Sequence, residues 1–238
     1  MTMSSAIKIW RLVEPINTIF AQCWLRSPAV VVKPSPCKSC EIELKYEHPS
    51  PLVLEWETGS DKVGDFVWPS GGRVAAKKSV LNAFAQEFPN IEIGPVEMVQ
   101  DASIKPQKKS NHLKPRVWLP YEGPLLEELI VNHTVPLLPD TTAKVIDVCN
   151  SCGRKSRILL GVETQEYKWD ISASALVEVR KQREPGKGIF VARSNIESHS
   201  FFRIEEFSSA IFCTNDTKRQ VEKYQLTNIS FLEYGDLI

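Results

Sequence analysis

Apolar and polar side chains alternate with a period of two residues in several stretches of the chain. This pattern predicts β-strands with one buried face, because successive side chains of a strand point to opposite faces. The first such stretch is residues 7–13, which read IKIWRLV. Further strands are predicted at residues 29–33, 52–56, 64–69, 91–98, 188–192, 201–204, 210–214 and 228–234.

A different spacing predicts helices. Between residues 77 and 88 the apolar residues recur three and four positions apart, as on the buried face of an amphipathic helix. A second helix is predicted at residues 216–225, where Asn215 or Asp216 can accept the free amides of the first turn. Pro124, followed by Leu125, Leu126, Leu129 and Ile130, predicts a short third helix.

Together these elements indicate an α+β fold with mainly antiparallel sheets and a few helices. The last strand, helix and strand form a strand-helix-strand unit that closes the fold. A length of 238 residues fits a single domain, residues 1–238, and also allows two lobes at residues 1–145 and 146–238.

The composition is that of a soluble globular protein, with 42% hydrophobic and 24% charged residues. No stretch approaches the ~18 uncharged apolar residues of a membrane span, so we expect no membrane association. Lys8, Arg11 and Glu14 interrupt the start of the chain, where a signal peptide needs an apolar core. We therefore expect a cytoplasmic protein.

The charges cancel, with 29 Lys and Arg against 29 Asp and Glu, so no overall field attracts a polyanion. Basic residues do gather at residues 102–116, a stretch without any acidic residue. We interpret it as a solvated loop, and gripping a phosphate backbone or an acidic partner is the alternative. The loop has no aromatic side chain on which a base would stack.

Two CxxC motifs give the clearest chemical signal. Two residues between the cysteines let both thiolates of a motif reach one ion, and two such knuckles complete a tetrahedral shell with no open position. We therefore predict one structural Zn²⁺ in a zinc-ribbon-like site, held by Cys37, Cys40, Cys149 and Cys152. Pro34 and Pro36 end the preceding strand, so Cys37 should lie in a turn. Gly153 suits the turn after the second motif because it tolerates positive φ.

Residues 41–148 separate the two motifs, far more than the ~15 to 20 residues of a compact zinc ribbon. Two disulfides, a redox pair, or buried thiols without metal therefore stay open as alternatives. A bound metal would tie the N-terminal segment to the C-terminal half of the chain. Cys23 and Cys213 lie inside apolar runs and are predicted to be plain core thiols.

The sequence offers no catalytic constellation, and we expect no catalytic residues. The four histidines are scattered without metal-binding spacing and are interpreted as surface or loop residues: His48, His112, His133 and His199. The adjacent carboxylates Glu127–Glu128 and Glu205–Glu206 point in different directions on regular elements, so they are interpreted as solvated.

In order along the chain stand IWRL, CKSC, GDFVWP followed by a helix, CNSCGR, and IFCTNDTKRQVEKYQLTNISF. This series resembles the double-CxxCG family, which occurs in multiple copies in myxobacteria. Glu41 follows the first motif where the family usually has glycine. The family is similar to immunity proteins of bacterial polymorphic toxin systems, so the resemblance implies a protein that binds and neutralises a cognate protein toxin.

A mixed-charge surface and a structural metal suit a stoichiometric binder of this kind. A zinc-ribbon nucleic-acid-binding protein that uses the basic loop is the alternative, and zero net charge argues against it. Residues 201–207 combine aromatic and charged side chains and are the first candidates for the partner surface.

Overall fold

The computed structural model describes residues 7–16, 19–26, 30–33, 37–39, 45–47, 50–69, 72–100, 114–153, 155–170, 172, 174–196 and 198–238. Strands are the main secondary structure of these residues, and they form two six-stranded sheets and three separate hairpins. Two α-helices and one short 3-10 helix, η1 (Arg193–Asn195), complete the described elements.

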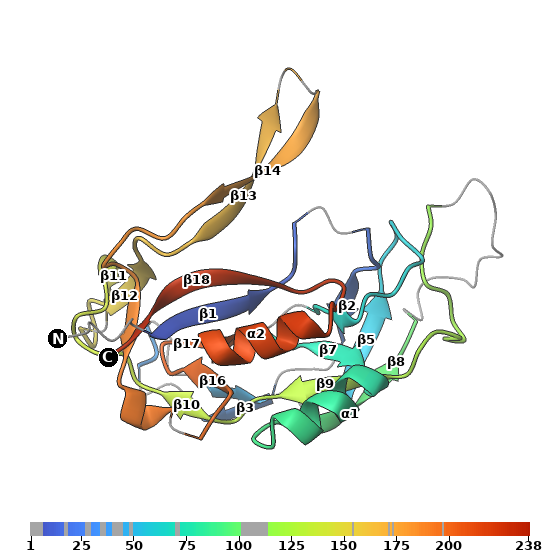
Figure 1. Ribbon diagram of the computed structural model, residues 1–238, viewed down its shortest axis with the longest axis horizontal. Coiled ribbons are helices and arrows are strands. Elements are labelled where there is room, and N and C mark those ends of the chain that lie inside the picture. Colours follow the sequence, from blue (N-terminus) through green and yellow to red (C-terminus); the bar gives the residue numbers. More distant parts are fainter. Residues whose placement is uncertain are drawn as a thin grey trace.

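The first sheet joins the two ends of the chain (Figure 1). Its order is β10 (Thr134–Val135), β16 (Phe201–Ile204), β17 (Phe207–Thr214), β1 (Ile7–Val13), β18 (Ser230–Leu237) and β15 (Ile189–Val191). β1 is antiparallel to both β17 and β18, and two outer pairs, β10 with β16 and β15 with β18, are parallel. Gly235 permits the last pairing, since a Cβ there would lie 1.8 Å from the Ile189 carbonyl oxygen.

The second sheet comes from the middle of the chain. Its order is β2 (Cys23–Leu25), β5 (Leu52–Trp56), β8 (Glu92–Met98), β9 (Leu126–Ile130), β7 (Ala75–Lys77) and β6 (Phe66–Val67). All its pairs are antiparallel except β5 with β8.

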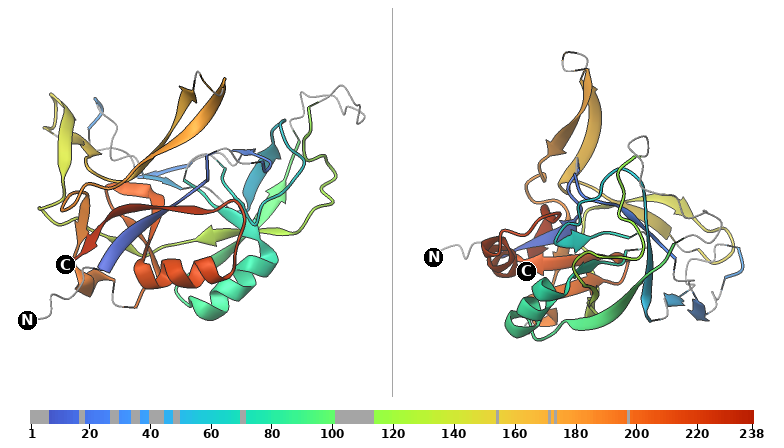
Figure 2. Two further views of the ribbon diagram at one scale, coloured as in Figure 1. Left: turned by 45° about the horizontal axis from the view of Figure 1, so that its top comes forward. Right: turned by 90° about the vertical axis from the view of Figure 1, so that its right-hand side faces the viewer.

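Three hairpins stand apart from the sheets: β3 (Val30–Lys33) with β4 (Lys45–Glu47), β11 (Ala143–Val148) with β12 (Lys155–Leu159), and β13 (Thr164–Asp170) with β14 (Ala175–Lys181). The β13–β14 hairpin projects from the body in every view, and we call it the arm (Figures 1 and 2). It has seven paired positions and no bulge.

The two α-helices, α1 (Lys78–Glu87) and α2 (Asn215–Lys223), lie side by side, and one core runs beneath them (Figure 2). Phe84 of α1 is fully buried and packs against aromatic rings from both sheets and from the residue after α2: Phe66, Phe201 and Tyr224. Tyr224 also donates a hydrogen bond to the Glu87 carboxylate at 2.5 Å. The two sheets therefore share their core through the helices.

The α+β prediction is confirmed at the level of mostly strands, mixed and antiparallel sheets, and two α-helices. Both confirmed helices begin and end within two residues of the predicted bounds. Neither described helix is long or apolar enough to cross a membrane. The single-domain and two-lobe alternatives stay predictions.

Three sequence predictions are wrong. The segment after Pro124 is the strand β9, not a helix, because it pairs on both sides, with β7 and with β8. Strand β1 buries side chains on both faces, with Ile9 in one core cluster and Leu12 in the other. The N-cap of α2 is Thr214, whose hydroxyl accepts a hydrogen bond from the Thr217 amide. The side-chain Oδ1 of Asn215 accepts a hydrogen bond from the Trp10 indole instead.

Replacing Phe84 by Ala should lower the free energy of unfolding by about 3–5 kcal/mol, because it removes a fully buried ring from the shared core. Chemical denaturation measures the change. Leu125→Ala is the control, since Leu125 is 68% exposed and its loss should change stability by less than about 0.5 kcal/mol. Equal effects of the two substitutions would contradict the shared core.

Asp65 joins the two sheets through Thr227, whose amide and hydroxyl donate to the carboxylate at 2.8 and 2.7 Å. Partial burial alone would raise the pKa of Asp65, but hydrogen bonds from Thr227 and Lys77 outweigh it and lower the pKa. A lowered folded-state pKa stabilises the protein above the unfolded value of about 4, and this stability is lost as the pH falls. Asp65→Asn should therefore cost about 1 kcal/mol near neutral pH, and the difference from wild type should shrink below about pH 4 in denaturation series.

Candidate metal centre

Three of the four predicted metal ligands lie together. The Sγ atoms of Cys37, Cys149 and Cys152 all lie within 4.8 Å of one another. Cys37 and Cys149 are 112 positions apart in the sequence, and their Sγ atoms are 3.7 Å apart. Among the residues that the structure describes, this is the one group of three or more Cys, His, Asp or Glu side chains close enough to hold a metal ion.

The second CxxC motif is the turn of the β11–β12 hairpin. Its backbone is folded so that the amides of Ser151 and Cys152 donate to the Cys149 sulfur, and these hydrogen bonds lower the pKa of that thiol. The Gly153 amide donates to the Cys149 carbonyl at 2.8 Å. Gly153 has φ of +73°, and a Cβ there would meet no atom within 4 Å, so the backbone angle alone favours glycine.

The first motif lies between the strands β3 and β4, and Cys37 is in the turn region as predicted. Cys37 is buried, Cys149 is half-buried and Cys152 is exposed. The hydroxyls of Ser39 and Ser151, one from each motif, are 2.7 Å apart. The two motifs therefore face each other. Cys40, the fourth predicted ligand, lies outside the described residues.

The donor set fits a tetrahedral metal site. When sulfur ligands stand ~2.3 Å from the ion, the edges of the tetrahedron are about 3.8 Å long. The Cys37–Cys149 separation of 3.7 Å is such an edge. None of the five described cysteines forms a disulfide. Cys37, Cys149 and Cys152 could thus hold a metal ion.

The other two described cysteines are core thiols, as predicted. Cys23 and Cys213 are 5% and 0% exposed. Burial raises the pKa of Cys23 to about 12 and raises the pKa of Cys213 further. Both stay protonated near neutral pH, and neither belongs to the group of cysteines that could hold a metal ion.

Sequence reasoning misjudged two polar groups. Glu128 is only 4% exposed and pairs with Arg73, so it is not a solvated carboxylate. Its neighbour Glu127 pairs with Lys78 at 2.9 Å. These two carboxylates serve different ion pairs and do not converge, whereas Glu205 and Glu206 are exposed as predicted.

The rings of His133 and His199 stack, with centroids 3.6 Å apart and planes 8° from parallel. Nothing in their sequence spacing indicates this contact. The pKa of His199 is lowered, mainly because the ring is partly buried. The charge of the neighbouring His133 lowers it further. His48 and His112 lie outside the described residues, as does most of the predicted basic loop. Of that loop, Arg116 is described, and it donates to the Trp56 carbonyl at 2.7 Å.

No protein-family model matches the chain, and neither does any protein of curated function. Membership of the double-CxxCG family therefore stays an expectation from the sequence motifs.

Replacing Cys149 by Ser should abolish metal binding and lower the free energy of unfolding by several kcal/mol, because the binding energy of a structural metal is also folding energy. Elemental analysis of protein purified without chelator, together with denaturation curves, checks both effects. Cys23→Ala is the matched control: it removes a buried thiol outside the cluster and should leave the metal content unchanged. Metal-free wild-type protein would contradict the site.

Proposed function

We propose that the protein is an immunity protein that binds a cognate protein toxin and neutralises it stoichiometrically. The observation that carries the proposal is that Cys37 lies against Cys149 and Cys152, which come from a distant part of the chain. A shell formed by both turns has no open position, and such sites stabilise a fold rather than perform chemistry. The proposal thus assigns the metal to the scaffold and the function to the surface.

Zinc is the proposed metal, with Cys40 as its fourth ligand. Four thiolates at tetrahedral positions select zinc over cations that prefer oxygen ligands. When bound, the ion would hold the β3–β4 and β11–β12 hairpins together, and the amides of the second turn would stabilise the Cys149 thiolate. Cys37 lies between the strands of the β3–β4 hairpin, and Cys149 and Cys152 lie in the turn of the β11–β12 hairpin. This arrangement supports the zinc-ribbon-like description.

Binding without turnover is supported by how the described polar groups are used. The Glu127 and Glu128 carboxylates belong to separate ion pairs, and the cysteines outside the cluster are buried and protonated. The resemblance to the double-CxxCG family supports a toxin as the bound protein, and the cytoplasm as the compartment follows from the same proposal.

Inhibition should be stoichiometric. When the purified protein is titrated into the toxin encoded by an adjacent reading frame, toxin activity should fall linearly to zero near one inhibitor per toxin. This result requires nanomolar affinity, or about 12 kcal/mol of binding energy. A catalyst would inactivate an excess of toxin over time, which would contradict the proposal. Retention of DNA or RNA that is lost steeply with added salt would instead favour the nucleic-acid-binding alternative.

A further inference from the structure

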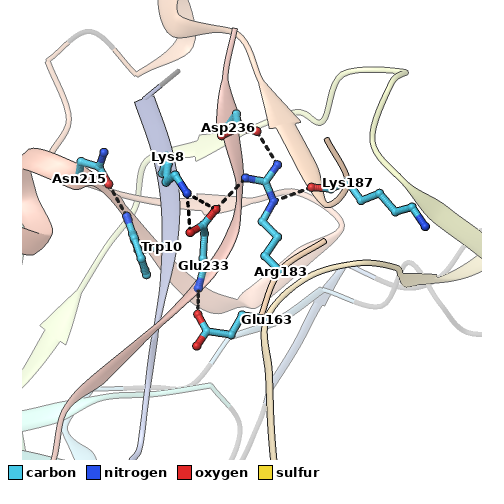
Figure 3. A network of polar contacts seen from close by, with 8 residues as sticks. All are labelled: Lys8, Trp10, Glu163, Arg183, Lys187, Asn215, Glu233 and Asp236. Atoms are coloured by element: carbon cyan, nitrogen blue, oxygen red, sulfur yellow. Dashed lines mark hydrogen bonds and ion pairs between the residues drawn. The ribbon is translucent and has the colours of Figure 1, made fainter. Parts of the chain in front are cut away.

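The base of the arm is held against the body by a network of charges (Figure 3). Glu163, the residue before β13, accepts a hydrogen bond from the Glu233 amide at 2.6 Å. The Glu233 carboxylate accepts two hydrogen bonds from Lys8 at 2.7 Å and one from Arg183, which follows β14, at 3.0 Å. Arg183 also donates to Asp236. Both strands of the arm are therefore tied to β18 at their base.

A cleft of about 820 Å³ lies beside this base, between the arm, α2 and the β1–β18 pair. Its charged groups already have partners. The four described cations pair with carboxylates of the same lining: Lys8, Arg180, Arg183 and Lys218. Glu184, the remaining carboxylate, pairs with Lys181 and Lys187. The aromatic floor is occupied too, since Lys218 Nζ lies 4.7 Å from the centroid of the Trp10 ring. The described lining thus leaves no charge without a partner.

Charges further out on the arm are in a different situation. Glu166 and Lys168 of β13 are exposed, and within the described part of the chain neither of them forms an ion pair or a side-chain hydrogen bond. On the other strand, β14, the charged residues Glu178, Arg180 and Lys181 all belong to ion pairs. One strand of the arm therefore carries charges that are satisfied within the chain, and the other carries two that are not.

β13 is also a long edge strand. The edge strands of the two six-stranded sheets are only two or three residues long: β10, β15, β2 and β6. Short edge strands are one of the ways in which proteins avoid pairing with other chains. β13 has seven residues and no proline, its pairing with β14 has no bulge, and it pairs with no other described strand. Its outer edge thus presents a regular row of backbone amides and carbonyls to an additional strand.

The charges of β13 are complementary to those of a second β13. In an antiparallel pair around a two-fold axis at position 167, the middle of the strand, all seven positions pair with the same seven positions of the second copy. Glu166 then lies opposite Lys168 of the second copy, and Lys168 lies opposite Glu166. Side chains directly opposite each other have Cβ atoms about 4.5–5.5 Å apart, which is within reach of an ion pair. The symmetry therefore supplies both unpaired charges with a partner.

Neighbouring registers are disfavoured. Moving the axis by one position, to 166 or 168, places two glutamates or two lysines directly opposite each other, and like charges in that arrangement are destabilising. The register at position 167 also covers the other face of the strand. Trp169, which is 62% exposed, lies on that face and comes opposite Gln165 of the second copy. Covering part of the indole ring removes apolar surface from water.

We propose that two copies of the chain dimerise through β13, edge to edge and antiparallel about position 167, so that the two arms form one four-stranded sheet. Glu166 of each copy pairs with Lys168 of the other. The proposal goes beyond the proposed function and does not depend on it. The surface also differs from residues 201–207, the partner surface predicted from the sequence, where Phe201 and Phe202 are 1% and 0% exposed and belong to the core.

Sedimentation equilibrium of the full-length protein tests the dimer. Seven paired positions make a small interface, so we expect a weak dimer with a Kd in the micromolar range. The wild-type protein should shift from monomer to dimer between about 1 and 300 µM. A protein that stays monomeric over this whole range would overturn the proposal, including the case in which β13 takes up a strand of another protein instead.

Charge exchange tests the register. Lys168→Glu should raise the Kd of the dimer at least about tenfold, because the symmetry places glutamate opposite glutamate twice. Glu166→Lys should have the same effect with lysines. The double variant Glu166→Lys/Lys168→Glu exchanges the two charges and should return the Kd to within about threefold of the wild-type value. An equimolar mixture of the two single variants should form a heterodimer for the same reason.

Glu178→Lys is the matched control, because Glu178 is an exposed glutamate on β14, the opposite edge of the arm. Glu206→Lys, in the exposed turn between β16 and β17, controls for the change in net charge. Both substitutions should leave the Kd unchanged. Thermal melting of every variant shows whether it is folded.

The remaining outcomes also decide. A dimer that is lost in Glu178→Lys and kept in Lys168→Glu would place the interface on β14 and overturn the assignment to β13. Single reversals that weaken the dimer without recovery in the double variant would overturn the direct pairing of Glu166 with Lys168. None of these results bears on toxin binding, which the titration with the adjacent gene product measures separately.

Discussion

The pairing of β1 with β17 and β18 is the constraint on which the rest of the structure depends. Seven residues near the start of the chain fill the gap between two strands that lie about two hundred residues further on, on either side of α2. Without β1, the strand-helix-strand unit would have an open central position. Because β1 buries Ile9 on one side and Leu12 on the other, its insertion also completes both core clusters of the first sheet.

The same pairing positions the cleft. Lys8 and Trp10 of β1 lie beside Glu233 and Phe231 of β18, so the fixed ion network and the aromatic floor both exist only when the two ends of the chain have met (Figure 3).

The cysteine cluster and the arm differ in how they are tied to the rest of the molecule. The cysteine cluster closes a loop of more than a hundred residues between two small hairpins, and hairpins of that size have little stability of their own. A metal would give them the stability that they lack. The arm has no such tie among its described contacts and is anchored at its base through Gln165 and Arg180.

The sequence by itself determined the local elements and the candidate metal ligands: the alternation of residues 7–13, the apolar spacing of both α-helices, and the two CxxC motifs, the second of which is followed by Gly153. These signals are local, since each depends on the side-chain period of one segment. Only the tertiary structure decided that the segment after Pro124 is a strand, that Glu128 is buried against Arg73, and that Phe201 faces the core. It also decided the cleft, whose lining comes from both ends of the chain and from the base of the arm. The physical reason is that burial and pairing depend on partners far away in the sequence, which no local period reports.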